Sequence, residues 1–396
     1  MDTSPASNVL ILKSQPRITF RRKFVMRLLR SVIGFVVIAA CEIGILLRFR
    51  NELFWYFYPY LQRSNLLRIF LLLLLVYYGT LVIHECGHVL CARLVRYRFL
   101  LMIAGPLKIE RTRRGIRVGL HKSIKFYQGL ASAIPLDAHH LRNKEIVVYA
   151  GGPLANLLQA IVFAACSSWL SFPVFSPIPL ILRLTAGFAL LASLANLIPL
   201  RTSDGFLTDG AGMLLLLKGG RPVERWCATL KLEMALAQGL LPREWNVDLL
   251  QSALSLPDGT LEDVTGCSYA YYKSLDMNDI TGARLLLERM LVARMDVPAS
   301  LRRWLSLEAA YFEARYHHNA TAARAWFERT KGITSDRCSK LRAEAAVLLA
   351  EGKKEKACLC IQKGLAKAKD ALFVGTERIE EMWLRDLLGL LDASPG

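Results

Sequence analysis

Three ionisable side chains lie close together in an apolar stretch of the chain, Leu81–Leu90: His84, Glu85 and His88. Histidines four residues apart share one face of a helix, so both can bind one metal ion from successive turns. Glu85 is placed to take a proton from a water molecule that the metal activates. An H-E-x-x-H sequence also arises by chance, but chance must then explain ionisable groups inside an apolar span as well. The segment therefore predicts a metal centre with hydrolytic chemistry.

A catalytic zinc site usually has three protein ligands and keeps its fourth position for water. The third ligand must come from elsewhere in the chain, and the irregular stretch after Pro199 contains two Asp-Gly pairs between apolar helices. Irregular backbone at membrane depth is tolerated only where protein or water surrounds it. Asp204 and Asp209 are the two candidates, and spacing alone leaves both open.

The elements that must position these residues are expected to be membrane spans. Hydrophobic residues make up 53% of the 396 residues, and the mean hydropathy is +0.31. Four apolar segments account for this excess: Ser31–Leu47, Leu66–Ala92, Ile146–Leu170 and Ile181–Pro199. The second carries the histidines, and each is close to the length that crosses a bilayer.

The net charge of +18 belongs to basic residues that cluster beside the apolar segments. The positive-inside rule then places both termini in the cytoplasm. We interpret the charge as a sign of topology and of contact with anionic lipid, and we expect neither a nucleic-acid partner nor a nucleotide site. Nine cysteines without a C-x-x-C pair predict neither disulfides nor a zinc ribbon.

Other features lie between and within the spans. Leu107–Thr112 and Ile116–Leu120 alternate apolar and polar residues around a glycine turn, which predicts a β-hairpin. Asn156 and Asn196 are polar residues inside apolar helices and need partners there.

The region from about Lys218 onward reads as soluble and helical. Three similar stretches follow one another in it, each with an alanine near its middle. These alanines are Ala283, Ala323 and Ala357, which are 40 and then 34 residues apart. A period of 34 is typical of tetratricopeptide repeats, so paired helices stacked as an irregular solenoid are expected. Such a domain would dock a protein partner, although plain helical packing without a partner fits the pattern too.

Three motifs in this order resemble the site-2 protease family of intramembrane zinc metalloproteases. They are His84–His88 with its intervening glutamate, the segment Gly151–Asn156 that opens the next span, and Asn196-x-x-Pro199 leading to Asp-Gly. The resemblance covers roughly residues 66–217. It implies a zinc peptidase that cuts the transmembrane helix of a membrane-protein substrate within or near the bilayer.

The resemblance also suggests roles for further residues. The hairpin at 108–120 corresponds to a membrane-associated β element that receives the substrate as an added strand. Asn156 and Asn196 become candidates for binding substrate or holding its unwound region, with helix packing as the alternative. The family spacing falls on Asp204, whereas a small residue and an apolar helix follow Asp209, so we favour Asp209 as the third ligand and keep Asp204 as the alternative.

The sequence therefore predicts a mainly α protein: a polytopic transmembrane helix bundle with a small membrane-associated β-hairpin, followed by a soluble tetratricopeptide-like domain. Its expected parts are a basic cytoplasmic segment, a first span with an aromatic interfacial connection, the metalloprotease core and the C-terminal domain, at 1–30, 31–65, 66–217 and 218–396. The compact four-span plan suggests a bacterial inner membrane.

The expected activity is zinc-dependent endopeptidase cleavage of membrane proteins, with Glu85 as the general base. A catalytically silent membrane scaffold that acts through its C-terminal repeats is the alternative. An ion transporter is a third hypothesis, and the concentration of polar residues around one site disfavours it.

Overall fold

The computed structural model describes residues 66–120, 129–171, 178–202, 205–293, 297–330 and 337–392. This part of the chain is mainly α-helical, with thirteen α-helices, one short 3-10 helix and a small four-stranded antiparallel sheet. The predicted first span at 31–47 and the aromatic connection after it lie outside the described residues.

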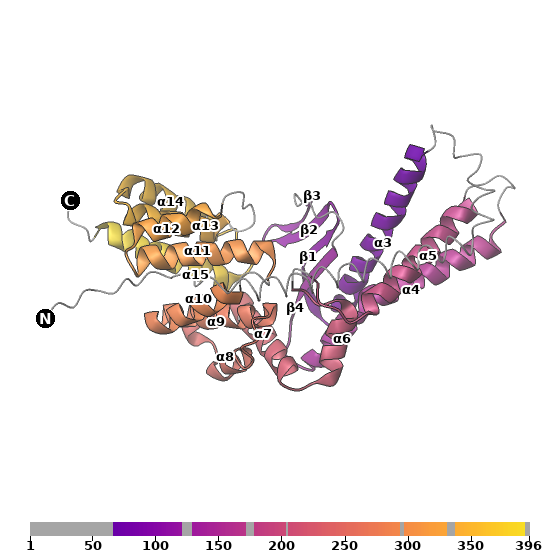
Figure 1. Cartoon of the computed structure of the whole chain (residues 1–396), viewed down its shortest axis with the longest axis horizontal. Coiled ribbons are helices and arrows are strands. Elements are labelled where there is room, and N and C mark those ends of the chain that lie inside the picture. The colour runs from indigo at the N-terminus through magenta and orange to yellow at the C-terminus, as the bar shows by residue number, and fades with distance from the viewer. Residues whose placement is uncertain are drawn as a thin grey trace, which may run out of the picture.

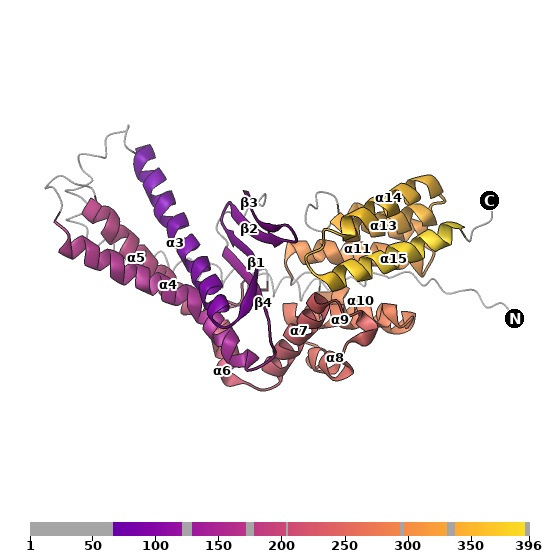
Figure 2. The ribbon, with the colours of Figure 1, turned by 180° about the vertical axis from the view of Figure 1, so that it is seen from behind.

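Three apolar helices form one end of the molecule: α3 (Leu66–Leu94), α4 (Leu141–Trp169) and α5 (Ile178–Leu197). By length and composition, α3 and α4 can each cross a membrane, and α5 contains a shorter apolar segment. Helices α4 and α5 run side by side, whereas α3 meets α4 at one end and diverges from it toward the other (Figure 1; Figure 2 shows the reverse side). The meeting end carries His84 and His88.

The four strands lie between the apolar helices and the C-terminal helices (Figure 1). They are β1 (Tyr97–Ala104), β2 (Leu107–Thr112), β3 (Gly115–Leu120) and β4 (Gly129–Pro135), in the order β3-β2-β1-β4. The pairing of β2 with β3 confirms the predicted hairpin. The sheet is larger than predicted, because β1 pairs with both β2 and β4.

The chain leaves the apolar helices through α6 (Asp209–Lys218) and a pair of glycines. Gly219 and Gly220 have φ angles of 74° and 77°, in the left-handed region that favours glycine. The C-terminal helices follow: α7 (Arg221–Gln238), η2 (Pro242–Glu244), α8 (Val247–Ala253), α9 (Leu261–Asp276), α10 (Ile280–Ala293), α11 (Ala299–Arg315), α12 (Ala320–Glu328), α13 (Arg337–Ala350), α14 (Lys354–Ala368) and α15 (Val374–Asp392).

Helices α9 to α14 form three consecutive helix pairs. Ala283, Ala323 and Ala357 occupy the second helix of each pair, and all three are fully buried. A residue without a side chain beyond Cβ lets two helices approach closely, which explains why alanine recurs at this place. The alanine spacing thus reflects helix packing.

The last helix, α15, packs against both hydrophobic cores of the C-terminal helices and also contacts the sheet. Trp383 packs in the core of the first helices of this domain, and Leu384 packs in the core of the last ones. At its beginning, Glu377 forms an ion pair with Arg113 in the turn of the β2–β3 hairpin. One helix therefore connects the two cores of the domain with the sheet.

Candidate metal centre

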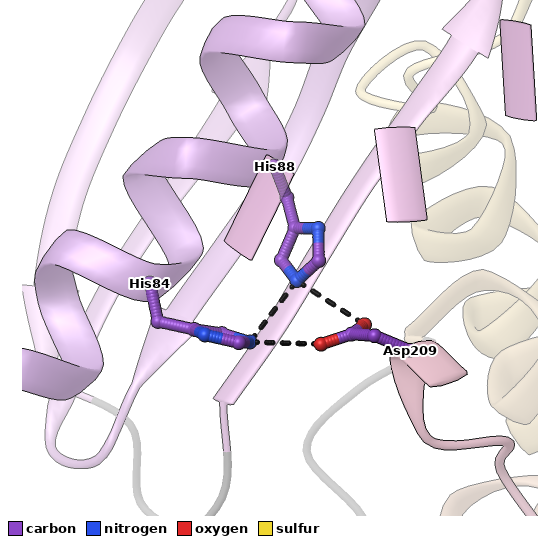
Figure 3. A group of neighbouring side chains, drawn as sticks. All are labelled: His84, His88 and Asp209. Carbon is purple, nitrogen blue, oxygen red and sulfur yellow. Dashed lines mark hydrogen bonds and ion pairs between the residues drawn. The ribbon is translucent and has the colours of Figure 1, made fainter. Parts of the chain in front are cut away.

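His84, His88 and Asp209 form one group of potential metal ligands (Figure 3). Nε2 of His84 lies 3.2 Å from Nε2 of His88. Asp209 approaches both rings, with Oδ2 3.1 Å from Nε2 of His84 and Oδ1 3.3 Å from Nε2 of His88. All three residues are buried, with exposed fractions of 5%, 8% and 9%. This buried group could hold a metal ion.

Asp209 is held by the first turn of α6. Thr208 is the N-cap, and its side-chain oxygen accepts a hydrogen bond from the backbone N–H of Ala211. Gly210 lies against the end of α5, where a Cβ atom would come within 1.9 Å of the carbonyl oxygen of Leu197. The Asp-Gly pair therefore combines a potential ligand with the residue that lets α6 begin against α5.

Glycines bring α3 and α4 together at the ligand group. A Cβ atom on Gly87 would lie 2.3 Å from the carbonyl oxygen of Gly151, so the two backbones touch. A Cβ atom on Gly152 would lie 2.4 Å from Nε2 of His88 and 2.5 Å from Nε2 of His84. Gly152 thus leaves open the space into which both histidine nitrogens point.

Helix α4 also contacts the other nitrogen of each ring. Nδ1 of His88 lies 2.7 Å from the carbonyl oxygen of Val148. Nδ1 of His84 lies 3.1 Å from the side-chain amide of Asn156, which is 1% exposed. Metal-binding histidines usually have such a partner on the ring nitrogen that faces away from the metal.

Glu85 lies beside the ligand group and is not part of it. The residue is 4% exposed, and it interacts electrostatically with His88 and Asp209. Its carboxylate packs against the first residue of β4, because a Cβ atom on Gly129 would come within 1.9 Å of Oε1 of Glu85. The end of a strand therefore reaches the candidate proton acceptor.

The donor set fits a divalent metal ion. With one donor atom taken from each residue, the three donor atoms lie within 4.8 Å of one another. The shortest contacts of Asp209 with the two rings, 3.1 and 3.3 Å, use its two different oxygens. Oδ2 of Asp209 is fully buried and accepts no hydrogen bond from the described residues. Buried acceptor atoms that face one another are stabilised by a cation between them.

The predicted site residues have different outcomes. His84, His88 and Asp209 come together with Glu85 at their side, whereas Asp204 lies outside the described residues. Asn196 does not join the group: its amide nitrogen donates to the carbonyl oxygen of Ala192 on its own helix. A role for Asn196 in substrate binding stays a prediction.

Several residues that shape the site were missed by the sequence reasoning. The carbonyl of Val148 is a backbone group and has no sequence signature. Thr208 could have been found, because a threonine immediately before Asp-Gly and an apolar run is a typical N-cap. The approach of Gly129 to Glu85 depends on tertiary structure, and no local signal predicts it.

Comparison of the chain with protein families, with curated proteins and with solved structures found no match. The geometry of the site and the character of the helices around it therefore carry the functional argument.

Proposed function

We propose that this protein is an intramembrane zinc metalloprotease that cleaves membrane-protein substrates. The observation that carries the proposal is the convergence of two histidines and an aspartate on one point, with a buried glutamate beside them. Two imidazoles and one carboxylate form a common catalytic zinc set, and zinc is the metal we assign to it.

The surroundings support a membrane location. Only 28% of the most apolar stretch of α3 and 33% of that of α4 is buried. Large side chains on these helices are exposed, such as Leu75 at 69% and Ile161 at 58%. A water-soluble protein rarely exposes so continuous an apolar surface. Lipid is the environment that stabilises it.

The basic residues support an orientation. Arg93 and Arg96 follow the histidine-bearing turns of α3, and Arg142 and Lys144 begin α4 at the same end. Under the positive-inside rule this end faces the cytoplasm. We accordingly propose a multi-pass protein, in a bacterial inner membrane, with cytoplasmic termini and a site near the cytoplasmic face.

The residues of the chain divide the chemistry among them. When bound, zinc would polarise the scissile carbonyl and make a water molecule easier to deprotonate, and therefore a better nucleophile. Glu85 accepts the proton of the attacking water and returns it to the leaving amine nitrogen. Glu85 on α3 is buried against the start of β4, so bulk water does not reach its carboxylate and compete for the proton.

Strand β4 is the element best placed to hold the substrate. It begins at Gly129 beside Glu85, and no described strand pairs with its outer edge. A substrate helix that unwinds could add to this edge as a strand and bring a peptide bond to Glu85. The β2–β3 hairpin, in which we expected the receiving strand, ends the sheet at the opposite edge.

The C-terminal helix pairs are proposed as a tetratricopeptide-like domain that docks a substrate or a regulatory protein. The alternative function, a scaffold without catalysis, assigns all activity to this domain and none to the metal centre. Measuring the zinc content of the purified protein separates the two, because a scaffold has no need for stoichiometric metal.

The decisive experiment replaces Glu85 with Gln. We expect the Glu85→Gln protein to retain about one zinc per chain and to lose cleavage of a membrane-anchored reporter by a factor of about 100 or more, as expected for removal of a general base. Glu110→Gln on β2 is the matched control and should cleave at the wild-type rate. Undiminished cleavage by Glu85→Gln contradicts the mechanism.

A further inference from the structure

Three positions on α4 lie against the two histidines at a regular spacing. Val148, Gly152 and Asn156 are four residues apart, so they follow one face of the helix. Val148 supplies a carbonyl to His88, Gly152 leaves room for both Nε2 atoms, and Asn156 supplies an amide to His84. One helix face thus contacts both nitrogens of each ring.

The contact at His88 determines which ring nitrogen carries the proton. A carbonyl oxygen only accepts hydrogen bonds, so Nδ1 of the neutral His88 ring must donate its proton to Val148. The lone pair is then on Nε2, which points toward Asp209 and His84. A neutral imidazole binds a metal through this lone pair.

The contact at His84 has two possible forms, because an amide has both a donor and an acceptor end. If the nitrogen of Asn156 donates to Nδ1 of His84, the ring proton lies on Nε2 and blocks the metal-binding position. If the oxygen of Asn156 accepts from Nδ1–H, the lone pair on Nε2 is free. The two amide orientations have the same shape and are assigned from their hydrogen bonds.

The proposed role of His84 as a metal ligand decides between the two forms, because only a ring with its proton on Nδ1 offers Nε2 to a metal. Oδ1 of Asn156 is buried and accepts no hydrogen bond from the described residues when the nitrogen faces His84. Reversing the amide exchanges the hydrogen bond of its nitrogen for one in which this oxygen, 3.1 Å from Nδ1, accepts the Nδ1–H of His84. The reversed form also gives both histidines the same tautomer.

We propose that Asn156 is a positioning residue that fixes the tautomer of His84, with its side-chain oxygen accepting the Nδ1–H hydrogen bond. This inference rests on the proposed metal site and assigns Asn156 to the protein's own histidine instead of to substrate. The effect is on metal affinity, because a ring held in the wrong tautomer must rearrange before it binds.

The test is a zinc-affinity measurement on the full-length protein in detergent, by competition with a coloured chelator. Asn156→Leu has nearly the same size and no acceptor, and we expect its zinc affinity to fall by about 10–100-fold. Asn156→Asp restores acceptor oxygens, and its affinity should be within a few-fold of the wild type or above it. Circular dichroism and thermal unfolding in detergent confirm that each variant is folded.

Gln159→Leu is the matched control. Gln159 is another buried amide on α4, and its partner is the hydroxyl of Thr80 instead of a histidine. We expect wild-type zinc affinity for this variant. Equal losses in Gln159→Leu and Asn156→Leu would overturn the inference, because Gln159 has no contact with a histidine.

Wild-type affinity in Asn156→Leu would overturn the inference, as would a loss in Asn156→Asp as large as that in Asn156→Leu. A wild-type protein that binds no zinc would instead refute the proposed function itself. The two failures are therefore distinguishable.

Discussion

Two regions of this protein bury ionisable groups, and they do so in opposite ways. In the C-terminal domain, Arg342 is 1% exposed and lies between Glu308 and Glu380. Its guanidinium donates to Glu308 at 2.7 Å and to Glu380 at 3.0 Å, and it stacks on the rings of Tyr311 and Trp383. The positive charge that these carboxylates need is built into the chain.

At the candidate metal centre the groups that face the carboxylate of Asp209 are the two imidazoles. Asp209 and Glu85 are buried with two imidazoles, and no arginine or lysine of the described residues is paired with either carboxylate. Burying a carboxylate without a counter-charge is costly. We infer that the cluster of Arg342, Glu308 and Glu380 (the Arg342 cluster) stabilises the fold, whereas the candidate metal centre could hold an added cation.

The largest expected effect is at the cluster that carries its own charge. Replacing Arg342 with Met leaves Glu308 and Glu380 buried without their partner, and we expect a loss of about 3–5 kcal/mol in the free energy of unfolding. Denaturant unfolding followed by tryptophan fluorescence measures it, since Trp304, Trp326 and Trp383 lie in this domain.

Its control removes all three charges together. The triple variant Glu308→Gln, Arg342→Met and Glu380→Gln should recover much of the lost stability, because no unpaired charge remains. Zinc content should be unchanged in both proteins. A triple variant as unstable as Arg342→Met would mean that packing, and not charge, holds this cluster together.

The next effect concerns the metal centre. In Gly152→Ala the new methyl group lies where both histidine nitrogens point, and His84 and His88 are held from behind by their Nδ1 contacts. We expect a loss of zinc affinity of about 100-fold or more, since ligand positions matter to within about 0.2 Å.

Gly187→Ala on α5 is the matched control, because a Cβ atom there has no neighbour within 4 Å. It should keep wild-type zinc affinity and gain up to about 1 kcal/mol in stability from the better helix propensity of alanine. Wild-type zinc affinity in Gly152→Ala would contradict the assignment of this space to a metal.

The two regions also differ in how much of them the sequence reveals. His84 and His88 could be paired from their spacing alone, since a helix brings residues four apart onto one face. The third ligand could be narrowed from the sequence only to Asp204 or Asp209, and the family resemblance was needed to favour Asp209, because helix periodicity does not connect distant segments. The Arg342 cluster has no motif at all, and Glu308, Arg342 and Glu380 come from three helices that only tertiary packing brings together.

The sheet shows a further limit of prediction. The β2–β3 hairpin was predicted because its turn and alternation are local. Strands β1 and β4 were not predicted, and the seven residues of β4 alternate only weakly. The strand nearest to Glu85 was therefore among those that the sequence did not reveal.

The smallest expected effect is on the pH dependence of stability and concerns Glu233 on α7. This carboxylate is buried in a third way, with neither an arginine nor imidazoles of the described residues beside it. Burial, and then the nearby carboxylate of Glu145, raises the pKa of Glu233 to about 7 from an ordinary value of 4.5. No arginine or lysine of the described residues is paired with Glu233. The fold therefore favours the neutral, protonated form of its side chain. The folded protein binds this proton more tightly than the unfolded chain does.

The sign of the pH dependence follows from this difference. The contribution of Glu233 to stability is fully present below about pH 4.5 and is lost as the pH rises through about 7. In Glu233→Gln, which mimics the protonated form, stability should fall less between pH 5 and pH 8, by about 1–2 kcal/mol relative to the wild type. Denaturant unfolding at several pH values measures this, with Glu224→Gln on the same helix as the control. An equal pH dependence in Glu233→Gln and the wild type would mean that Glu233 is ionised in the fold and has a counter-charge, as Glu308 and Glu380 do.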